Sequence, residues 1–89
     1  MAGDLKQVSA TGDVTGAGRY LQSVVLTGGS DAATLAVKDG SGGATRLTLK
    51  AAANASVGWT SGDPDGVAFT AAIHATLTGT GPVATFEFS

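Results

Sequence analysis

The sequence predicts an all-β protein, a small antiparallel β-sandwich or barrel of about seven or eight short strands, rich in hairpins, with little or no helix. Apolar and polar residues alternate with a period of two through most of the chain. Turn-forming clusters of Gly, Asp, Ser and Pro separate these segments at residues 28–31, 39–43, 61–66 and 79–82. The one stretch that favours helix, residues 51–55, is a single turn long at most.

The longest alternating segment runs from residue 67 to residue 77, with apolar residues or alanine at its odd positions. We expect one long strand with one apolar face, or two strands with a bend near Ala71 and Ala72. At the end of the chain, Phe86 and Phe88 are expected to share one face of a strand.

The remaining strands follow from shorter patterns. Residues 6–11 predict a first strand, and residues 34–38 and 57–59 predict two short ones. Residues 45–51 predict a half-buried strand whose outer face carries Arg46, Thr48 and Lys50. Residues 19–27 have apolar side chains on both faces, which indicates a central strand buried on both sides. Residues 26–35 and 77–86 resemble each other, and we expect two similar hairpins there.

These patterns divide the chain into two parts. Residues 1–18 form an N-terminal arm, or a first strand with a loop, and residues 19–89 form a single β-sandwich domain. The large apolar residues of the predicted strands are the candidates for the core or for a subunit interface. They are Tyr20, Val24, Leu26, Leu47, Leu49, Trp59, Phe69, Ile73, Leu77, Phe86 and Phe88.

The composition excludes several classes of protein. A sequence pI near 4.9 and only five scattered basic residues argue against binding to nucleic acid, which needs basic patches. No apolar run is long enough to cross a membrane as a helix. Because the chain has no Cys and one His, disulfides and zinc sites of the Cys/His type are excluded.

Small side chains dominate the sequence. Gly, Ala, Thr and Ser account for 49 of the 89 residues, and 16 of the hydrophobic residues are Ala. A domain of this size buries only about 60% of the surface that its unfolded chain exposes. Small domains without disulfides or metals commonly gain stability by oligomerisation, so we expect a homo-oligomer.

Three features of the sequence have residue types suited to a chemical site, and a structural role explains each of them better. His74 lies on the Thr-rich face of its strand, where we expect a surface or interface histidine. Asp63 and Asp65 could start a calcium loop but lack further acidic ligands, and a type I turn explains them. Trp59 and Tyr20 could stack on a sugar, although core or interface packing is the simpler role. We therefore expect no catalytic, metal-binding or cofactor-binding residues.

Most of the chain from residue 20 onward resembles small virion proteins of tailed bacteriophages, of the capsid decoration (cement) or head-fibre type. The residues that carry the resemblance are 23–34, 49–54, 61–67, 75–80 and 83–88. Residues 1–18 are not covered by it. The motifs combine turns with strands.

The resemblance implies a structural protein that binds the major capsid protein and stabilises the phage head, with a trimer as the favoured oligomer. It would be made in the host cytoplasm and lie on the capsid surface of the virion. The alternative is a carbohydrate-binding, adhesin-like β-module of a fibre or tail. An enzyme or metal-binding module centred on His74 or on the turn with Asp63 and Asp65 is a third possibility.

Overall fold

The computed structural model describes residues 4–62 and 66–89, and this part of the chain contains nine strands and no helix. The all-β fold class predicted from the sequence is confirmed. The strands are β1 (Asp4–Val8), β2 (Gly12–Asp13), β3 (Arg19–Thr27), β4 (Ala33–Asp39), β5 (Thr45–Ala51), β6 (Ser56–Thr60), β7 (Val67–Phe69), β8 (Ile73–Thr78) and β9 (Val83–Phe88).

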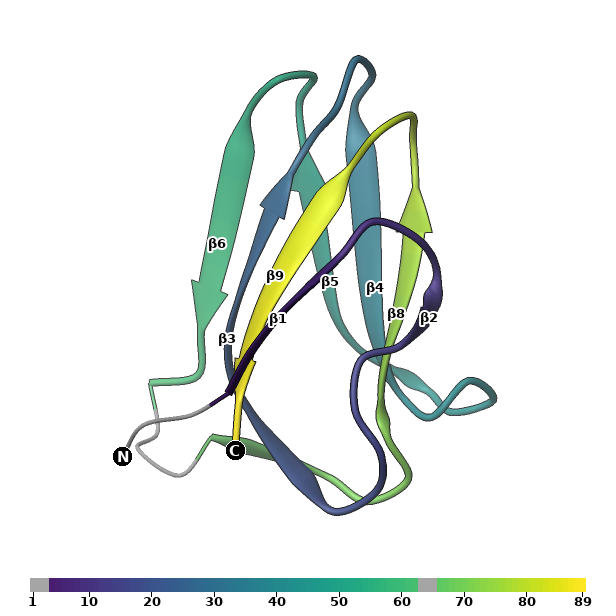
Figure 1. The fold of residues 1–89 in the computed structure, drawn as a ribbon, viewed down its shortest axis with the longest axis vertical. Coiled ribbons are helices and arrows are strands. Elements are labelled where there is room, and N and C mark those ends of the chain that lie inside the picture. The colour runs from purple at the N-terminus through teal and green to yellow at the C-terminus, as the bar shows by residue number, and fades with distance from the viewer. Residues whose placement is uncertain (1–3, 63–65) are drawn as a thin grey trace.

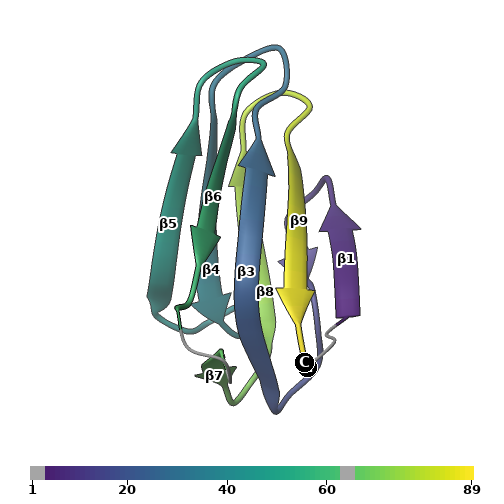
Figure 2. The ribbon, with the colours of Figure 1, turned by 90° about the vertical axis from the view of Figure 1, so that its left-hand side faces the viewer.

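The strands form two antiparallel sheets that pack face to face as a sandwich (Figure 1). Sheet A has the order β1-β9-β3-β6, and the short strand β7 also pairs with β3. Sheet B has the order β2-β8-β4-β5. Figure 2 shows β1 at one lateral edge of the sandwich, and β5 and β6 at the opposite edge.

The core lies between the sheets and is built by the alternation seen in the sequence. In β4, for example, Leu35 and Val37 are fully buried, whereas Ala36 and Lys38 are only half-buried. The largest buried side chains come from five strands and meet in one cluster. They are Leu21, Val24, Leu26, Leu35, Val37, Phe69, Ile73 and Phe86.

The predicted pair of similar hairpins is wrong. The connection from β3 to β4 and the connection from β8 to β9 both cross from one sheet to the other. In each case the two strands face each other across the core instead of pairing, because each then buries its apolar side against the other sheet. Among the described strands, β4 and β5 are the pair that is joined as a hairpin.

The alternating segment at residues 67–77 forms two strands with a bend between them, which is the second of the two arrangements expected from the sequence. Strand β7 pairs with β3 in sheet A, and β8 pairs with β4 in sheet B. The chain therefore changes sheets at residues 70–72. The segment at residues 51–55, which favours helix by composition, forms no helix, since Ala51 ends β5 and residues 52–55 connect β5 to β6, with Asn54 at a φ of 59°.

Strand β3 and the N-terminal part of the chain both contribute side chains to the core. Strand β3 is central in sheet A but is buried on one face only, since Tyr20 and Val25 on its other face are 45% and 43% exposed. The prediction of burial on both faces is wrong, because no strand of the described part of the chain covers the outer side of sheet A. Within residues 1–18, β1 pairs with β9, β2 pairs with β8, and Val14 enters the core.

Asp39, the last residue of β4, holds the turn at which the chain changes sheets. Its Oδ1 accepts the backbone N–H of Ala71 at 2.8 Å and that of Ala72 at 3.4 Å. Its Oδ2 accepts the N–H and the hydroxyl of Thr70 at 3.3 and 3.1 Å. The hydrogen bond from the Ala71 N–H is the largest influence and, with the others, it lowers the pKa of Asp39 below its usual 3.8, although partial desolvation opposes this.

We expect Asp39→Asn to lower the melting temperature at neutral pH, because the amide accepts these hydrogen bonds less well than the carboxylate. The folded-state pKa lies below the unfolded value of 3.8. The contribution of the ionised carboxyl is therefore complete above that value and is lost as the pH falls through the lower folded pKa. The difference in melting temperature between wild type and variant should shrink in that acidic range.

Thermal melts followed by circular dichroism from neutral to strongly acidic pH measure this difference. The matched control is Asp31→Asn, since Asp31 is exposed in the β3–β4 connection, and its melting temperature should follow that of wild type throughout. A gap for Asp39→Asn that stays constant below pH 3.8 would show that the charge of Asp39 does not stabilise the turn.

Candidate functional site

The candidate core and interface residues fall into three groups. Seven of them are buried in the core, namely Val24, Leu26, Leu49, Phe69, Ile73, Phe86 and Phe88. Leu47, Trp59 and Leu77 are half-buried and pack against the core from its margin. Tyr20 does not contribute to the core and lies on the open outer face of sheet A.

His74 is less exposed than the sequence predicts. It is 8% exposed, and its Nδ1 lies 2.8 Å from Oδ1 of Asp13, the residue opposite it in β2. A catalytic triad would require, in addition, a nucleophile at the other ring nitrogen. The contact instead links the two-residue strand β2 to β8.

The possible metal site at Asp63 and Asp65 lies outside the described residues. In the part of the chain that the structure does describe, no three His, Cys, Asp or Glu side chains come together in a way that could hold a metal ion. The described chain likewise has no helix long and apolar enough to cross a membrane.

Trp59 and Tyr20 do not form one stacking platform. Trp59 is paired with the buried Val24 in the β3–β6 register and packs against the core. Tyr20 lies beside the exposed Ala68 and points to the outer face of the same sheet. Because the two rings lie on opposite faces of sheet A, they cannot stack on the same sugar.

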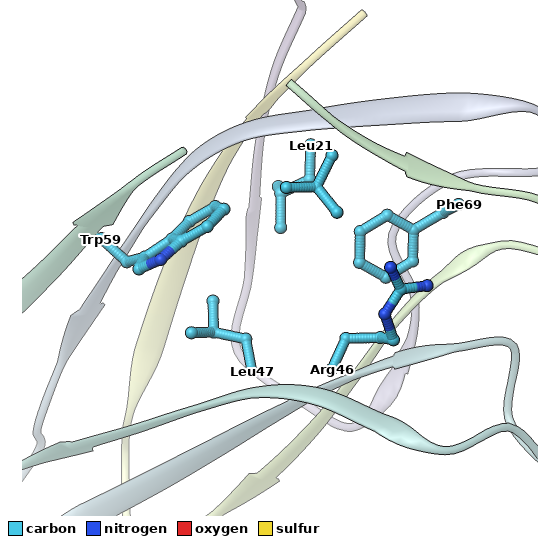
Figure 3. A pocket seen from close by; sticks show the side chains of 6 residues that line it. Leu21, Arg46, Leu47, Trp59 and Phe69 are labelled. Atoms are coloured by element: carbon cyan, nitrogen blue, oxygen red, sulfur yellow. The ribbon is translucent and has the colours of Figure 1, made fainter. Parts of the chain in front are cut away.

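A hollow of about 100 Å³ opens where β5, β6 and β7 border the core. It is lined by Leu21, Arg46, Leu47, Trp59, Val67 and Phe69. Figure 3 shows Leu21, Leu47, Trp59 and Phe69 arranged around a common space, with the Arg46 guanidinium beside the Phe69 ring. We call this hollow the edge pocket. Its described walls are mostly apolar, and Arg46 is the cationic residue among them.

Arg46 reaches the edge pocket because of a β-bulge. In the β4–β5 pair, Val37 lies opposite Leu47, and the next residue, Lys38, lies opposite Thr45. Arg46 therefore has no residue opposite it in β4 and forms the bulge. The Arg46 Cζ lies 5.3 Å from the centroid of the Phe69 ring, and Nη1 lies 3.8 Å from Oδ2 of Asp39. The prediction that Arg46 shares the outer face with Thr48 and Lys50 is therefore wrong. The period-two pattern contains no signal for a bulge.

The outer faces of the two sheets differ in chemistry. Exposed large apolar side chains of the described chain all belong to sheet A: Leu5 is 71% exposed, and Tyr20 and Val25 are about half exposed. The register places all three on the outer side of the sheet, which also carries the polar side chains of Gln7, Ser23, Thr85 and Glu87. We call this surface the apolar face, after its three exposed apolar residues. The outer side of sheet B carries Thr and Lys side chains instead, from residues 34, 38, 48, 50, 76 and 78.

Comparison of the chain with protein-family models, with curated proteins and with solved structures found no match in any of the three. The surfaces that stand out chemically are the apolar face and the edge pocket. Exposed apolar side chains and an apolar hollow are the kinds of surface feature that can contact another molecule.

Proposed function

We propose that this protein is a structural component of a tailed-bacteriophage virion, a decoration protein that binds the major capsid protein and stabilises the head. It acts as an oligomer, with a trimer favoured, at the capsid surface. The resemblance of residues 23–34, 49–54, 61–67, 75–80 and 83–88 to small phage virion proteins supports this proposal.

The apolar face is the single structural observation that carries the proposal furthest. Singly exposed apolar residues are ordinary, but here the exposed large ones among residues 4–62 and 66–89 all lie on one side of one sheet. Aromatic residues such as Tyr20 are enriched at protein interfaces, where the ring buries area and the hydroxyl keeps a polar partner. A protein whose work is binding would present such a face to its partner.

The chemistry of the described residues supports a binding role over a catalytic one. The His74–Asp13 pair is occupied in joining two strands, and the edge pocket contains no nucleophile or general base among its lining residues. We propose accordingly that the protein is not an enzyme and that it acts without a cofactor.

Co-sedimentation with phage shells tests the proposal. Purified protein is mixed with expanded shells and with precursor shells of the phage that carries it, and the pelleted fraction is measured. We expect saturable binding to expanded shells and little binding to precursor shells. The absence of binding to either shell would contradict the proposal.

Two variants connect the binding to the apolar face. Val25→Asp places a charge in the middle of this face and should weaken shell binding at least tenfold. Thr48→Asp makes the same kind of change on the outer side of sheet B, where residue 48 is exposed, and should bind as wild type does. Equal binding by both variants would show that the apolar face is not the capsid-binding surface.

A further inference from the structure

The most exposed large hydrophobic side chain of the described chain lies next to a carboxylate. Leu5, in the edge strand β1, is directly opposite Glu87 of β9 and shares its face of the sheet. The Glu87 carboxylate accepts a hydrogen bond from the Ser23 hydroxyl at 3.1 Å, which fixes its position beside Leu5. Together the two residues present a branched aliphatic group with a negative charge at its side, which we call the Leu5 knob.

The edge pocket has the complementary properties. A dry apolar cavity of about 150 Å³ holds a benzene ring, so a hollow of about 100 Å³ suits a smaller, branched group of four carbons such as a leucine side chain. Among the described residues that line it, the charged one is Arg46, whose side chain is 43% exposed. Arg46 is 3.8 Å from Asp39, beyond hydrogen-bonding distance, and guanidinium groups have several donors available for a second carboxylate.

One copy of the chain cannot fill its own pocket with its own knob. Strand β1 is one edge of sheet A, whereas β6 is the opposite edge, and β9 and β3 lie between them. Three strand spacings of about 4.8 Å separate the two edges. Figure 2 shows this arrangement, with β1 on one side and β5 and β6 on the other.

We infer that the Leu5 knob of one copy inserts into the edge pocket of a second copy, with Glu87 facing Arg46 of that copy. The contact joins two different patches, so it is heterologous, and each added copy offers a new free knob and a new free pocket. Such a contact repeats until a ring closes, and a closed trimer has this type of interface. The inference rests on the oligomeric part of the proposed function and does not involve the capsid.

Mixing two variants tests this contact in solution, without shells. Leu5→Asp removes the knob and leaves the pocket intact, and Arg46→Glu repels Glu87 and leaves the knob intact. By light scattering after size exclusion, wild type should be oligomeric and each variant alone monomeric. An equimolar mixture should form a one-to-one dimer, because one intact knob and one intact pocket remain. Val25→Ser, which removes an exposed apolar side chain outside the contact, should assemble as wild type does.

The fluorescence of Trp59 is an independent measurement of assembly, since Trp59 lines the edge pocket and is the only tryptophan in the chain. Its emission maximum should shift to shorter wavelength as wild type assembles on concentration, and should stay constant in Leu5→Asp. Circular dichroism melts establish that both variants are folded. A monomeric wild type, or variants that assemble like wild type, would overturn the inference, as would a mixture that stays monomeric. Because shells are absent, none of these outcomes depends on capsid binding.

Discussion

Replacing Ile73 by Asp is expected to unfold the protein. Ile73 is completely buried at the start of β8, in the layer between the sheets. The variant loses the burial of a large apolar side chain, about 1.5–3 kcal/mol, and leaves an unpaired carboxylate in the core, which costs about 3–5 kcal/mol more. The sum approaches the whole stability of a domain, about 5–15 kcal/mol. Circular dichroism should show no cooperative thermal transition.

The matched control is Thr78→Asp in the same strand. Thr78 is exposed on the outer side of sheet B, and its replacement should change the free energy of unfolding by less than about 1 kcal/mol. A cooperative transition in Ile73→Asp near the wild-type temperature would mean that β8 presents its other face to the core.

Gly29→Ala is expected to give the second largest loss of stability. Three connections meet at one end of the sandwich, those from β3 to β4, from β5 to β6 and from β8 to β9 (Figures 1 and 2). A Cβ at Gly29 would lie 2.0 Å from the Thr80 carbonyl oxygen, and the same oxygen accepts the Ser30 N–H at 3.1 Å. The backbones must therefore separate, at a cost of about 3 kcal/mol, the upper part of the range for overpacking.

For a domain of this size, such a loss lowers the melting temperature by about 15 °C. Gly42→Ala is the control, since a Cβ there meets nothing within 4 Å, and its effect should stay within about 0.5 kcal/mol. Similar melting temperatures for the two variants would show that the three connections do not pack as closely as described.

In the strands with regular alternation, the sequence was sufficient to predict which residues face the core. It correctly separates Phe86 from Thr85 in β9, and Leu35 from Ala36 in β4, because side chains on a strand alternate between the two faces and only one face of each sheet is covered. The same pattern does not indicate which strand each strand pairs with. It therefore predicted hairpins at residues 26–35 and 77–86, where the chain crosses between sheets.

Local features that break the alternation could not be predicted. The bulge that directs Arg46 into the edge pocket depends on the pairing of β5 with β4. The burial of His74 depends on β2, which is only two residues long and too short to give a pattern. The role of Asp39 depends on residues 70–72, which follow it by more than 30 positions and approach it only in the folded chain. Each of these is a tertiary contact, not a local preference.

The two proposals assign different parts of the surface to different partners. The Leu5 knob and the edge pocket join copies of the chain, and Tyr20 and Val25 remain on the apolar face for the capsid. Variants should therefore separate the two activities. Leu5→Asp should fail to form oligomers in solution. Val25→Asp should keep the wild-type oligomeric state and lose binding to shells.

The number of copies on a mature particle tests the central claim most directly. Virions are purified, and the ratio of this chain to the major capsid protein is measured by quantitative mass spectrometry. A decoration protein that covers the shell should be present in hundreds of copies, in simple proportion to the capsid protein. Absence from purified particles, or a handful of copies as expected for a portal, tail or vertex component, would contradict the account.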